Sequence, residues 1–456
     1  MGDGSTQTYP TSSIENIHFG QGNDFTITTE DGKTIAFDGN ASNIKFKKNH
    51  AIDGTSVQTI TQSLGLGWNL GNNLDAQNNG YASETAWGNH IATLKTFQAV
   101  KAAGFSSVRI PITWMGHIGN APDYKIEEKY MNRVAEVVGY AKEAGLKAII
   151  NIHHDGADSK YWLDILGASK SEERNTQVKN QFAAIWKQIA ERFKQEGDYL
   201  IFEAMNEIHD GNWGWGENRT DGGKQYRIYN EWLQLFVDVV RSTGGENKYR
   251  YLGCPGYVTN IDLTISELKL PTDIVKNRLL VAVHFYDPYT YALNNEKTEW
   301  GHTGRDKEEW GDEENVVDNF NRMKKKFVDN GIPVYLGEFG CVHRSTDRAE
   351  AFRKYYLEYV CKAAKEYGLA LFFWDNGSAG TGKEQSGLID HGTGAYLNNG
   401  KEVIDIMMDA YNNDDPSYTL QSVYNNAPRQ TGNLISSHSQ RAQFITHSQE
   451  FPKVKR

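Results

Sequence analysis

The sequence predicts an α/β protein built as a (β/α)8, or TIM, barrel, and three observations support this. Short apolar runs alternate with longer amphipathic stretches, eight such runs occur, and no nucleotide-binding glycine motif follows the first run. Eight strands with helices between them close most simply into a barrel, whose usual length of about 250 residues extends past about 400 when loops are long. An open doubly wound sheet would need a Gly-x-Gly-x-x-Gly motif at that place.

The eight expected strands are short runs rich in Val, Ile, Leu and Phe. They span residues 64–70, 106–113, 147–154, 199–207, 249–256, 279–286, 333–340 and 369–375. The stretches between them with helical periodicity include residues 91–103, 127–144, 176–195, 226–240, 316–328 and 348–366. This pattern assigns residues 60–412 to one barrel domain.

Both ends of the chain differ from this pattern. Residues 25–29 and 34–37 flank Glu30-Asp-Gly-Lys33, whose Asp-Gly pair favours a two-residue hairpin turn. We therefore expect residues 1–59 to contain a β-hairpin that closes the bottom of the barrel. From residue 413 the chain is polar and lacks a sustained period, so we expect residues 413–456 to form a disordered C-terminal extension.

Composition and charge exclude several kinds of partner. The 58 acidic residues outnumber the 48 basic ones, which argues against binding to nucleic acid. The longest apolar runs are far shorter than the ~20 residues that a membrane helix needs, so we expect no membrane association. Three widely spaced cysteines predict neither a disulfide framework nor a zinc site, and we expect them to pack as small apolar residues: Cys254, Cys341 and Cys361. Met1-Gly-Asp-Gly-Ser-Thr6 does not resemble a signal peptide.

Polar residues stand at the ends of the expected strands, where a barrel brings its functional groups to one face. The strand-end residues are Arg109, Asn151, His153, His154, Asp155, Asn206, Glu207, His284, Tyr286, Glu338 and Trp374. A single strand-end glutamate is more often a helix cap or an exposed group. Glu207 and Glu338, on the fourth and seventh strands, would however face each other across the barrel mouth. Two carboxylates that straddle a bond are what glycoside cleavage needs.

Metal chemistry is the main alternative use of these residues, because histidine-rich barrels can hold zinc. Neighbouring residues on a strand point to opposite faces, so His153 and His154 are not expected to bind one ion. His284 and Tyr286 share a face, which we take to be the cavity. We therefore expect no metal and no cofactor.

Seven motifs together resemble glycoside hydrolase family 5, and the first of them resembles its bacterial endoglucanase and xyloglucanase branch. They are Gly67-Trp-Asn-Leu-Gly-Asn72 with Asp75, Val108-Arg-Ile-Pro111, Ile149-Ile-Asn-Ile-His153, Ala204-Met-Asn-Glu207, His284-Phe-Tyr286, Gly337-Glu-Phe-Gly340 and Trp374-Asp-Asn-Gly377. The resemblance covers residues 60–412, with the motifs in the expected order on the expected strands.

The resemblance implies a retaining endo-β-1,4-glucanase with Glu207 as the acid/base and Glu338 as the nucleophile. Their carboxyl groups would then lie ~5–5.5 Å apart. Arg109 would hold Glu338 ionised, while Glu207, in a drier position, would keep a raised pKa and its proton. Asn206 would bind the 2-hydroxyl of the sugar. Further polar groups would line the site: Tyr286, which can donate to the nucleophile or the ring oxygen, His284 and His153.

Aromatic and polar residues around this centre are expected to bind the polysaccharide. Trp374 offers a flat face for a pyranose ring, and three residues would bind hydroxyls toward the non-reducing side: Asn72, Asp75 and His154. Trp213 and Trp215, in the loop after Glu207, are candidate platforms for the leaving group, although both could instead pack the loop. Trp162 is a weaker candidate.

We expect a β-glucan substrate of the cellulose type, and xyloglucan and mixed-linkage β-glucan as further substrates. A β-mannanase or glucomannanase would use the same two glutamates, and a catalytically silent carbohydrate-binding barrel would keep the tryptophans. A phosphate-dependent isomerase would need a glycine-rich site, for which only residues 377–382 are a candidate. We expect a monomer that acts outside the cell or at its surface.

Overall fold

Eight parallel strands close into a barrel in the order β10-β11-β12-β13-β4-β7-β8-β9. The structure is a computed structural model, and it describes residues 14–19, 25–29, 34–37 and 57–429. The strands are β4 (Leu66–Leu70), β7 (Ser107–Ile110), β8 (Lys147–Ile150), β9 (Leu200–Glu203), β10 (Leu252–Pro255), β11 (Leu279–Phe285), β12 (Val334–Phe339) and β13 (Ala370–Asp375). Each falls within one of the expected runs, so the (β/α)8 barrel is confirmed.

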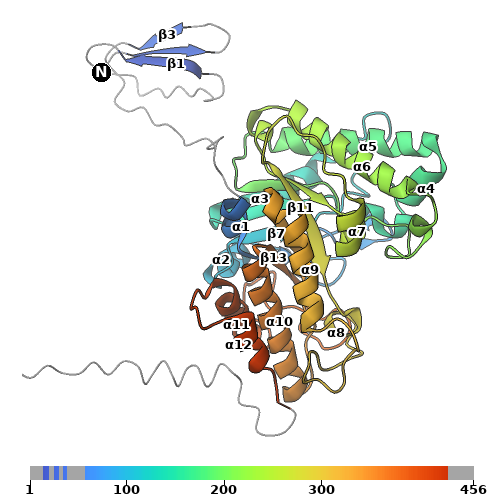
Figure 1. Cartoon of the computed structure of the whole chain (residues 1–456). Helices are drawn as coiled ribbons and strands as arrows, with labels where there is room; N and C mark the ends of the chain where they lie inside the picture. Colours follow the sequence, from blue (N-terminus) through green and yellow to red (C-terminus); the bar gives the residue numbers. More distant parts are fainter. Residues whose placement is uncertain (1–13, 20–24, 30–33, 38–56, 430–456) are drawn as a thin grey trace, which may run out of the picture. The chain divides into compact units, whose positions relative to one another are not determined.

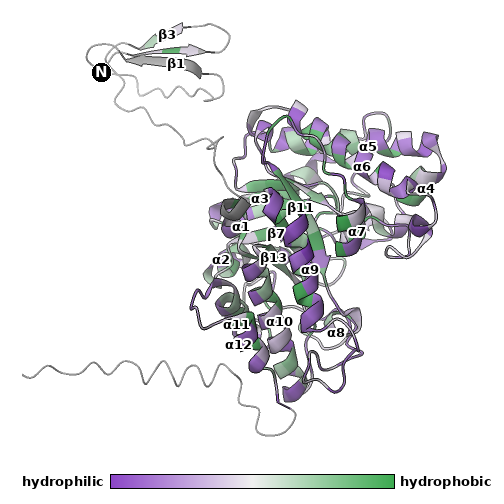
Figure 2. Cartoon of the chain, viewed as in Figure 1, coloured by the Kyte–Doolittle hydropathy of each residue, from purple (hydrophilic) through white to green (hydrophobic). Residues whose placement is uncertain are grey.

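Helices surround the strands, with polar residues on their outer faces (Figures 1 and 2). They are α2 (Leu94–Ala102), α3 (Glu128–Glu143), α4 (Ile165–Lys170), α5 (Glu172–Arg192), α6 (Lys224–Ser242), α7 (Ile261–Glu267), α8 (Tyr289–Ala292), α9 (Glu313–Lys326), α10 (Asp347–Tyr367) and α11 (Gly400–Asn412). In α6, Ile228, Trp232, Phe236 and Val240 are all buried. Residues four apart share one helix face, so this spacing packs α6 onto the barrel.

A short helix before the first barrel strand supplies part of the barrel interior. This helix, α1 (Val57–Leu64), places Ile60 and Leu64 in the cluster that fills the barrel. The strand residues of that cluster are Ile149, Ile201, Leu280, Ala282, Tyr335, Ala370 and Phe372. Residue 64, which we expected to begin a strand, therefore ends a helix.

The N-terminal unit, Met1–Gly54, is separate from the unit that begins at Thr55. In it, β2 (Phe25–Thr29) pairs antiparallel with β3 (Thr34–Phe37), which confirms the expected pairing. A third strand, β1 (Ile14–Phe19), pairs with β2 and was not expected. The turn residues 30–33 lie outside the described residues, and the expected covering of the barrel stays a prediction.

The C-terminal boundary expected at residue 412 is wrong. Residues 413–429 continue the ordered body and include α12 (Leu420–Asn425), which packs against α10. Val423 is buried, and the Tyr418 hydroxyl donates to Glu358 Oε1 at 2.9 Å. Tyr418, Val423 and Ala427 are the buried apolar residues of this otherwise polar segment. Residues 430–456 lie outside the described part of the chain.

The cysteines are all free and buried, which agrees with the expected packing role. Among the residues that the structure describes, no helix is both long enough and apolar enough to cross a bilayer.

Candidate active site

Two glutamates meet at the carboxyl end of the barrel strands. Glu207 follows β9, and Glu338 lies in β12. One carboxylate oxygen of each residue and a ring nitrogen of His284 all lie within 4.8 Å of one another. Glu338 is buried, whereas the side chain of Glu207 is 21% exposed. Glu207 is therefore the more accessible of the two carboxyl groups.

Arg109, on β7, holds Glu338 in place. Its Nη1 donates to Glu338 Oε1 at 2.9 Å, as the sequence analysis expected. The guanidinium also faces a second carboxylate, because Nη2 donates to Glu203 Oε1 at 2.8 Å and Nε to the same oxygen at 3.2 Å. Burial alone would lower the pKa of Arg109, but Glu203 and Glu338 outweigh burial and raise it. The arginine is thus a fixed cation shared by two carboxylates.

Glu203 is a residue of the site that the sequence analysis missed. It ends β9 inside the barrel and also accepts hydrogen bonds from Asn151 Nδ2 at 2.9 Å and from the Tyr335 hydroxyl at 2.6 Å. The sequence did contain an indication of this role. Glu203 lies two residues after Ile201 in an apolar strand, so both side chains point to the barrel interior. An acidic residue at such a position needs a buried partner.

Two residues at the end of β11 contact the catalytic carboxylates. The Tyr286 hydroxyl donates to Glu338 Oε2 at 3.0 Å. His284 Nδ1 lies 2.6 Å from Glu207 Oε1 and 3.6 Å from Glu338 Oε2. Gly337 makes room for the imidazole, because a Cβ there would lie 3.1 Å from His284 Nε2. The shared face expected for His284 and Tyr286 is therefore present.

The pKa directions of the two glutamates are opposite to those we expected. Burial raises the pKa of Glu338, and the nearby Glu207 adds to this effect, although His284 and Arg109 oppose it. Burial also acts to raise the pKa of Glu207, but the adjacent His284 outweighs burial and lowers it. The difference arises because the sequence did not reveal the His284 contact or the division of Arg109 between two carboxylates.

Asn206 and His153 complete the polar wall. Asn206 Oδ1 accepts from Arg109 Nη2 at 2.7 Å, which fixes the amide beside the carboxylates. His153 Nδ1 accepts from Asn151 Nδ2 at 3.1 Å, and its Nε2 lies 3.9 Å from Glu338 Oε1. Burial lowers the pKa of His153 well below its usual value, so the ring is neutral at neutral pH.

Trp374 forms a flat surface next to this wall. Its ring is parallel to that of His153, with 5.9 Å between the ring centroids and 4° between the planes. The indole packs on backbone at Gly71, where a Cβ would lie 3.0 Å from the ring. A larger residue at position 71 would displace the tryptophan.

The residues expected on the non-reducing side lie close together. His154 Nε2 is 3.6 Å from Asp75 Oδ2, and both atoms are buried without a hydrogen-bond partner. One potential ligand atom from each of Asp75, His153 and His154 falls within a 4.8 Å cluster. The argument that His153 and His154 face opposite ways is therefore wrong, because β8 ends at Ile150 and both residues lie beyond regular strand geometry. The side chain of Asn72 forms no hydrogen bond within residues 57–429.

The two tryptophans after Glu207 are exposed rather than packed into their loop. Trp213 is 57% exposed and Trp215 is 79% exposed. Trp213 has a φ of 52°, which is unfavourable for a bulky residue, and its ring stacks on buried His209 with centroids 4.4 Å apart. Trp215 has Arg219 4.7 Å above its ring. By contrast, Trp162 is partly buried and donates to Asp155 Oδ1 at 2.7 Å, which is a structural contact.

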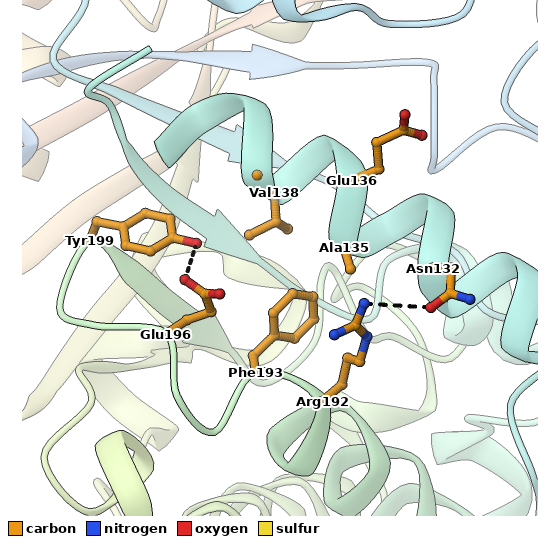
Figure 3. A pocket seen from close by; sticks show the side chains of 9 residues that line it. Asn132, Ala135, Glu136, Val138, Arg192, Phe193, Glu196 and Tyr199 are labelled. Atoms are coloured by element: carbon orange, nitrogen blue, oxygen red, sulfur yellow. Dashed lines mark hydrogen bonds between the residues drawn. The ribbon is translucent and has the colours of Figure 1, made fainter. Parts of the chain in front are cut away.

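A cavity of about 360 Å³ lies away from these residues, between α3 and the chain that leads from α5 into β9 (Figure 3). Arg192 and Tyr199 line it, and Tyr199 precedes the amino end of β9. Because the carboxylates lie at the opposite ends of the strands, this cavity is not part of the candidate active site.

Comparisons with known proteins agree with this geometry. Residues 71–380 match the family model Cellulase (glycosyl hydrolase family 5). Endoglucanase A of Paenibacillus barcinonensis is 38% identical over 340 residues, which cover 70% of this chain and 82% of that protein. A xyloglucan-specific endo-β-1,4-glucanase of Bacteroides ovatus is 34% identical, over 71% of this chain and 66% of that protein. The solved structure of a GH5-4 broad specificity endoglucanase from Bacteroides salanitronis is 59% identical with a TM-score of 0.78, and the match covers 82% of this chain and all of that one.

Proposed function

The chain belongs to glycosyl hydrolase family 5 and is a glycoside hydrolase, and we propose that it cleaves internal β-1,4 bonds of glucans with retention of anomeric configuration. The observation that carries this proposal is the short separation of Glu207 and Glu338, whose nearest oxygens lie within 4.8 Å. Retaining enzymes hold their carboxyl groups about 5–5.5 Å apart, whereas inverting enzymes leave about 6.5–9.5 Å for a water molecule.

In the first step, Glu338 attacks the anomeric carbon while the bond from that carbon to the leaving oxygen breaks. Glu207 gives its proton to the leaving oxygen, so the departing sugar leaves as an alcohol and the glycosyl group becomes an ester of Glu338. Arg109 and the Tyr286 hydroxyl orient the two oxygens of Glu338. Asn206, held by Arg109, is placed to bind the 2-hydroxyl of the reacting sugar.

In the second step, water attacks the anomeric carbon of this ester. Glu207, now a carboxylate, takes a proton from the water as its oxygen bonds to the carbon, and Glu338 leaves as a carboxylate. Glu338 is neutral as an ester, so one negative charge near Glu207 is removed during the intermediate. The loss of that charge makes Glu207 easier to ionise at the moment when a base is needed.

The acid in this account is the hydrogen-bonded pair of Glu207 and His284. The 2.6 Å between Oε1 and Nδ1 joins the two groups by a hydrogen bond. A bound polysaccharide displaces water from around Glu207, which favours the neutral carboxylic acid. The pKa of Glu207 is therefore lowered by His284 in the free enzyme, and the bound polysaccharide restores its role as the acid in the complex.

The relatives support the proposed substrate class. Two of them are described as an endoglucanase and a xyloglucan-specific endo-β-1,4-glucanase, and a third as a broad specificity endoglucanase. We therefore propose cellulose-type β-glucan as the substrate, with xyloglucan and mixed-linkage β-glucan in addition. A polymer of this kind cannot enter a cell, so we place the enzyme outside the cell or at its surface.

The proposed function also assigns roles to the substrate-binding residues. Trp374 carries the sugar on the glycone side, and Asn72, Asp75 and His154 bind hydroxyls there. Trp213 and Trp215, which are exposed in the loop after Glu207, bind the sugar of the leaving group. Aromatic faces suit this task because the axial hydrogens of a pyranose ring form an apolar patch.

Rates on carboxymethyl cellulose, xyloglucan, lichenan and glucomannan, measured side by side, test the substrate assignment. We expect the three glucans to be hydrolysed with a fall in viscosity that precedes most of the reducing-sugar release, as internal cleavage requires. A rate on glucomannan or mannan far above all three glucans would favour the β-mannanase instead.

A further inference from the structure

The last residue of β13, Asp375, is a fully buried carboxylate with many donors around it. Its Oδ2 accepts hydrogen bonds from Trp68 Nε1 at 2.8 Å and from the backbone N–H groups of Leu388 and Ile389 at 3.0 Å each. Its Oδ1 accepts from the Gly377 N–H at 2.9 Å. Four donors to one carboxyl group favour its ionised form, so Asp375 is a buried anion.

His391 lies against this anion, and the contacts of its ring place a proton on both nitrogens. Nε2 is 3.2 Å from Asp375 Oδ1, and Nδ1 is in hydrogen-bond contact with Asn73 Oδ1. The orientation of the Asn73 amide follows from its Nδ2, which donates to the His90 carbonyl oxygen at 2.8 Å. Asn73 Oδ1 is therefore an acceptor, as is the carboxylate. Because both ring nitrogens face acceptors, both donate, and His391 is an imidazolium.

The two charges form an ion pair without access to solvent, since the side chains of His391 and Asp375 are both 0% exposed. Removing one partner of such a pair leaves an uncompensated charge in the interior. Each charge is therefore stable only where it meets the other. The pair holds the segments that carry the two residues in one relative position.

One of these segments carries Trp374. The Trp374 indole packs on Gly71, whose N–H donates to the carbonyl oxygen of Asp375 at 2.9 Å. The Trp374 carbonyl oxygen accepts from Ser386 Oγ at 3.0 Å, two residues before the first N–H that binds the Asp375 carboxylate. The contacts of Asp375 thus fix the backbone on both sides of the tryptophan.

The same pair also reaches Asp75, on the loop after β4. Asn73, the acceptor of His391 Nδ1, donates its backbone N–H to Asp75 Oδ1 at 2.9 Å. The other oxygen of Asp75 is the one that lies 3.6 Å from His154 Nε2. Hydrogen bonds therefore run from Asp375 through His391 and Asn73 to Asp75. They connect the ends of β13 and β4, which are neighbours in the barrel.

We propose that His391, as an imidazolium paired with Asp375, is a positioning residue that holds Trp374 and Asp75 in place for the reacting sugar. The inference rests on the proposed function, which assigns these two residues to substrate binding. His391 and Asp375 are fully buried, so they act through their neighbours and not on the sugar itself. A displaced sugar slows the chemical step more than it weakens binding, because reaction requires aligned atoms whereas affinity is spread over many contacts.

The kinetic test compares two substitutions of His391 by kcat and KM on an aryl cellobioside. His391→Gln keeps a neutral donor near the Nε2 position, and His391→Asn keeps a donor only near the Nδ1 position. We expect kcat to fall about tenfold in His391→Gln and about 100-fold in His391→Asn, as a misplaced substrate would cause. KM should stay within about threefold of that of the unchanged enzyme.

His90→Ala is the matched control. His90 Nδ1 also lies 3.2 Å from an aspartate, Asp390 Oδ2, and the pair joins the same two loops, but the side chain of His90 is 70% exposed. An exposed contact of this kind contributes little. The substitution should leave both kcat and KM unchanged.

A fluorine NMR measurement separates positioning from a general loss of structure. In enzyme labelled with fluorotryptophan, the resonance of Trp374 is assigned by its absence in Trp374→Phe. We expect this resonance to shift or broaden in His391→Asn and to stay unchanged in His90→Ala. The resonances of Trp186 in α5 and Trp232 in α6, which are buried against other parts of the barrel, should not move in any variant.

The charge of His391 is tested without any substitution in the enzyme under study. NMR of enzyme labelled with isotopic nitrogen in its histidines should show a proton on each ring nitrogen of His391, with the signals assigned by their loss in His391→Gln. One bare ring nitrogen would overturn the imidazolium. This measurement decides the point even if His391→Asn does not fold.

Other results would also contradict the proposal. An unchanged kcat in both His391 variants overturns it, and so does a rise in KM without a fall in kcat. A lower melting temperature with an unmoved Trp374 resonance would leave His391 a role in stability alone and would overturn positioning. Failure of the proposed function would be distinct, because the unchanged enzyme would then not hydrolyse the aryl cellobioside, whereas both NMR results would stand.

Discussion

Arg109 Nη2 lies 2.8 Å from Glu203 Oε1, so the guanidinium that contacts the nucleophile also forms an ion pair with a second, fully buried carboxylate. The charge of Arg109 is therefore divided between two anions. Burial and the second glutamate of the catalytic pair raise the pKa of Glu338, and Arg109 offsets only part of that rise. We infer that Glu203 sets how strongly Arg109 stabilises the nucleophile.

Replacing Glu203 by Gln should move the acid limb of the pH profile of kcat, which reports the enzyme–substrate complex, to lower pH. Glu338 acts as a carboxylate, so activity is lost as the pH falls through its pKa, and a raised pKa places this limb above the ordinary value of about 4.3. Removing the negative charge of Glu203 leaves more of the Arg109 charge for Glu338 and lowers that pKa. Tyr335→Phe, which removes a hydrogen bond to Glu203 but no charge, is the control. An upward shift in Glu203→Gln would refute this role.

Replacing Glu207 by Gln should remove the alkaline limb of the profile, because no proton then remains to be lost at the acid. The loss in kcat/KM should be about 10²–10⁴-fold on unactivated glucan, the usual contribution of a general acid. It should be far smaller on a dinitrophenyl glycoside, whose leaving group needs no proton. An equal loss on both substrates, with the bell-shaped profile unchanged, would mean that Glu207 is not the acid.

His209 should control how well the enzyme uses sugars on the leaving-group side. Its Nδ1 accepts from the Trp213 N–H at 3.3 Å and from Gly211 N–H at 3.0 Å, which holds the unusual backbone conformation of Trp213. His209→Asn places an acceptor near the Nδ1 position, and His209→Phe keeps only the stacked ring. We expect transfer of the glycosyl group to added cellobiose, relative to hydrolysis, to fall in His209→Phe and in Trp213→Ala. It should be better preserved in His209→Asn.

The same transfer ratio in His209→Phe as in the unchanged enzyme would show that the hydrogen bonds at Nδ1 do not position the tryptophan. Hydrolysis of a dinitrophenyl cellobioside serves as the internal control, since that substrate does not place a sugar on the leaving-group side.

Val423 should contribute measurably to stability, although the sequence pattern did not predict an ordered helix there. It is the buried residue of α12, so Val423→Ala should lower the free energy of unfolding by about 1–3 kcal/mol through lost apolar contact and an unfilled cavity. Gln421→Ala, at an exposed position on the same helix, is the matched control. Thermal unfolding that does not distinguish the two variants would mean that α12 is not anchored through Val423.

The barrel could be predicted because its strands are buried on both faces and read as continuous apolar runs, such as residues 279–285. The short helix α12 could not, because its burial depends on Tyr418 and Val423 meeting α10, a contact between residues far apart in the sequence. Local pattern carries no information about such a contact.

The candidate site also has a part that the sequence predicted and a part that it did not predict. Glu207 and Glu338 were predicted because they stand at strand ends, where the fold itself brings residues together. The 2.6 Å contact between His284 and Glu207 could not be predicted, because it depends on side-chain conformations. Reasoning from strand parity also failed for His153 and His154, since it assumed that β8 extends past Ile150.

The double-displacement mechanism requires that Glu338 forms a covalent bond to the sugar. A dinitrophenyl 2-deoxy-2-fluoro-cellobioside slows both steps but provides a leaving group that needs no acid, so the ester should accumulate. Intact mass should rise by one fluorocellobiosyl group, and peptide mapping should place it on Glu338. Glu231→Ala, which removes an exposed glutamate of α6, should label normally, and Glu338→Gln should not label. Attachment to any other residue, or turnover of unactivated glucan with inverted configuration and no labelling, would contradict the account.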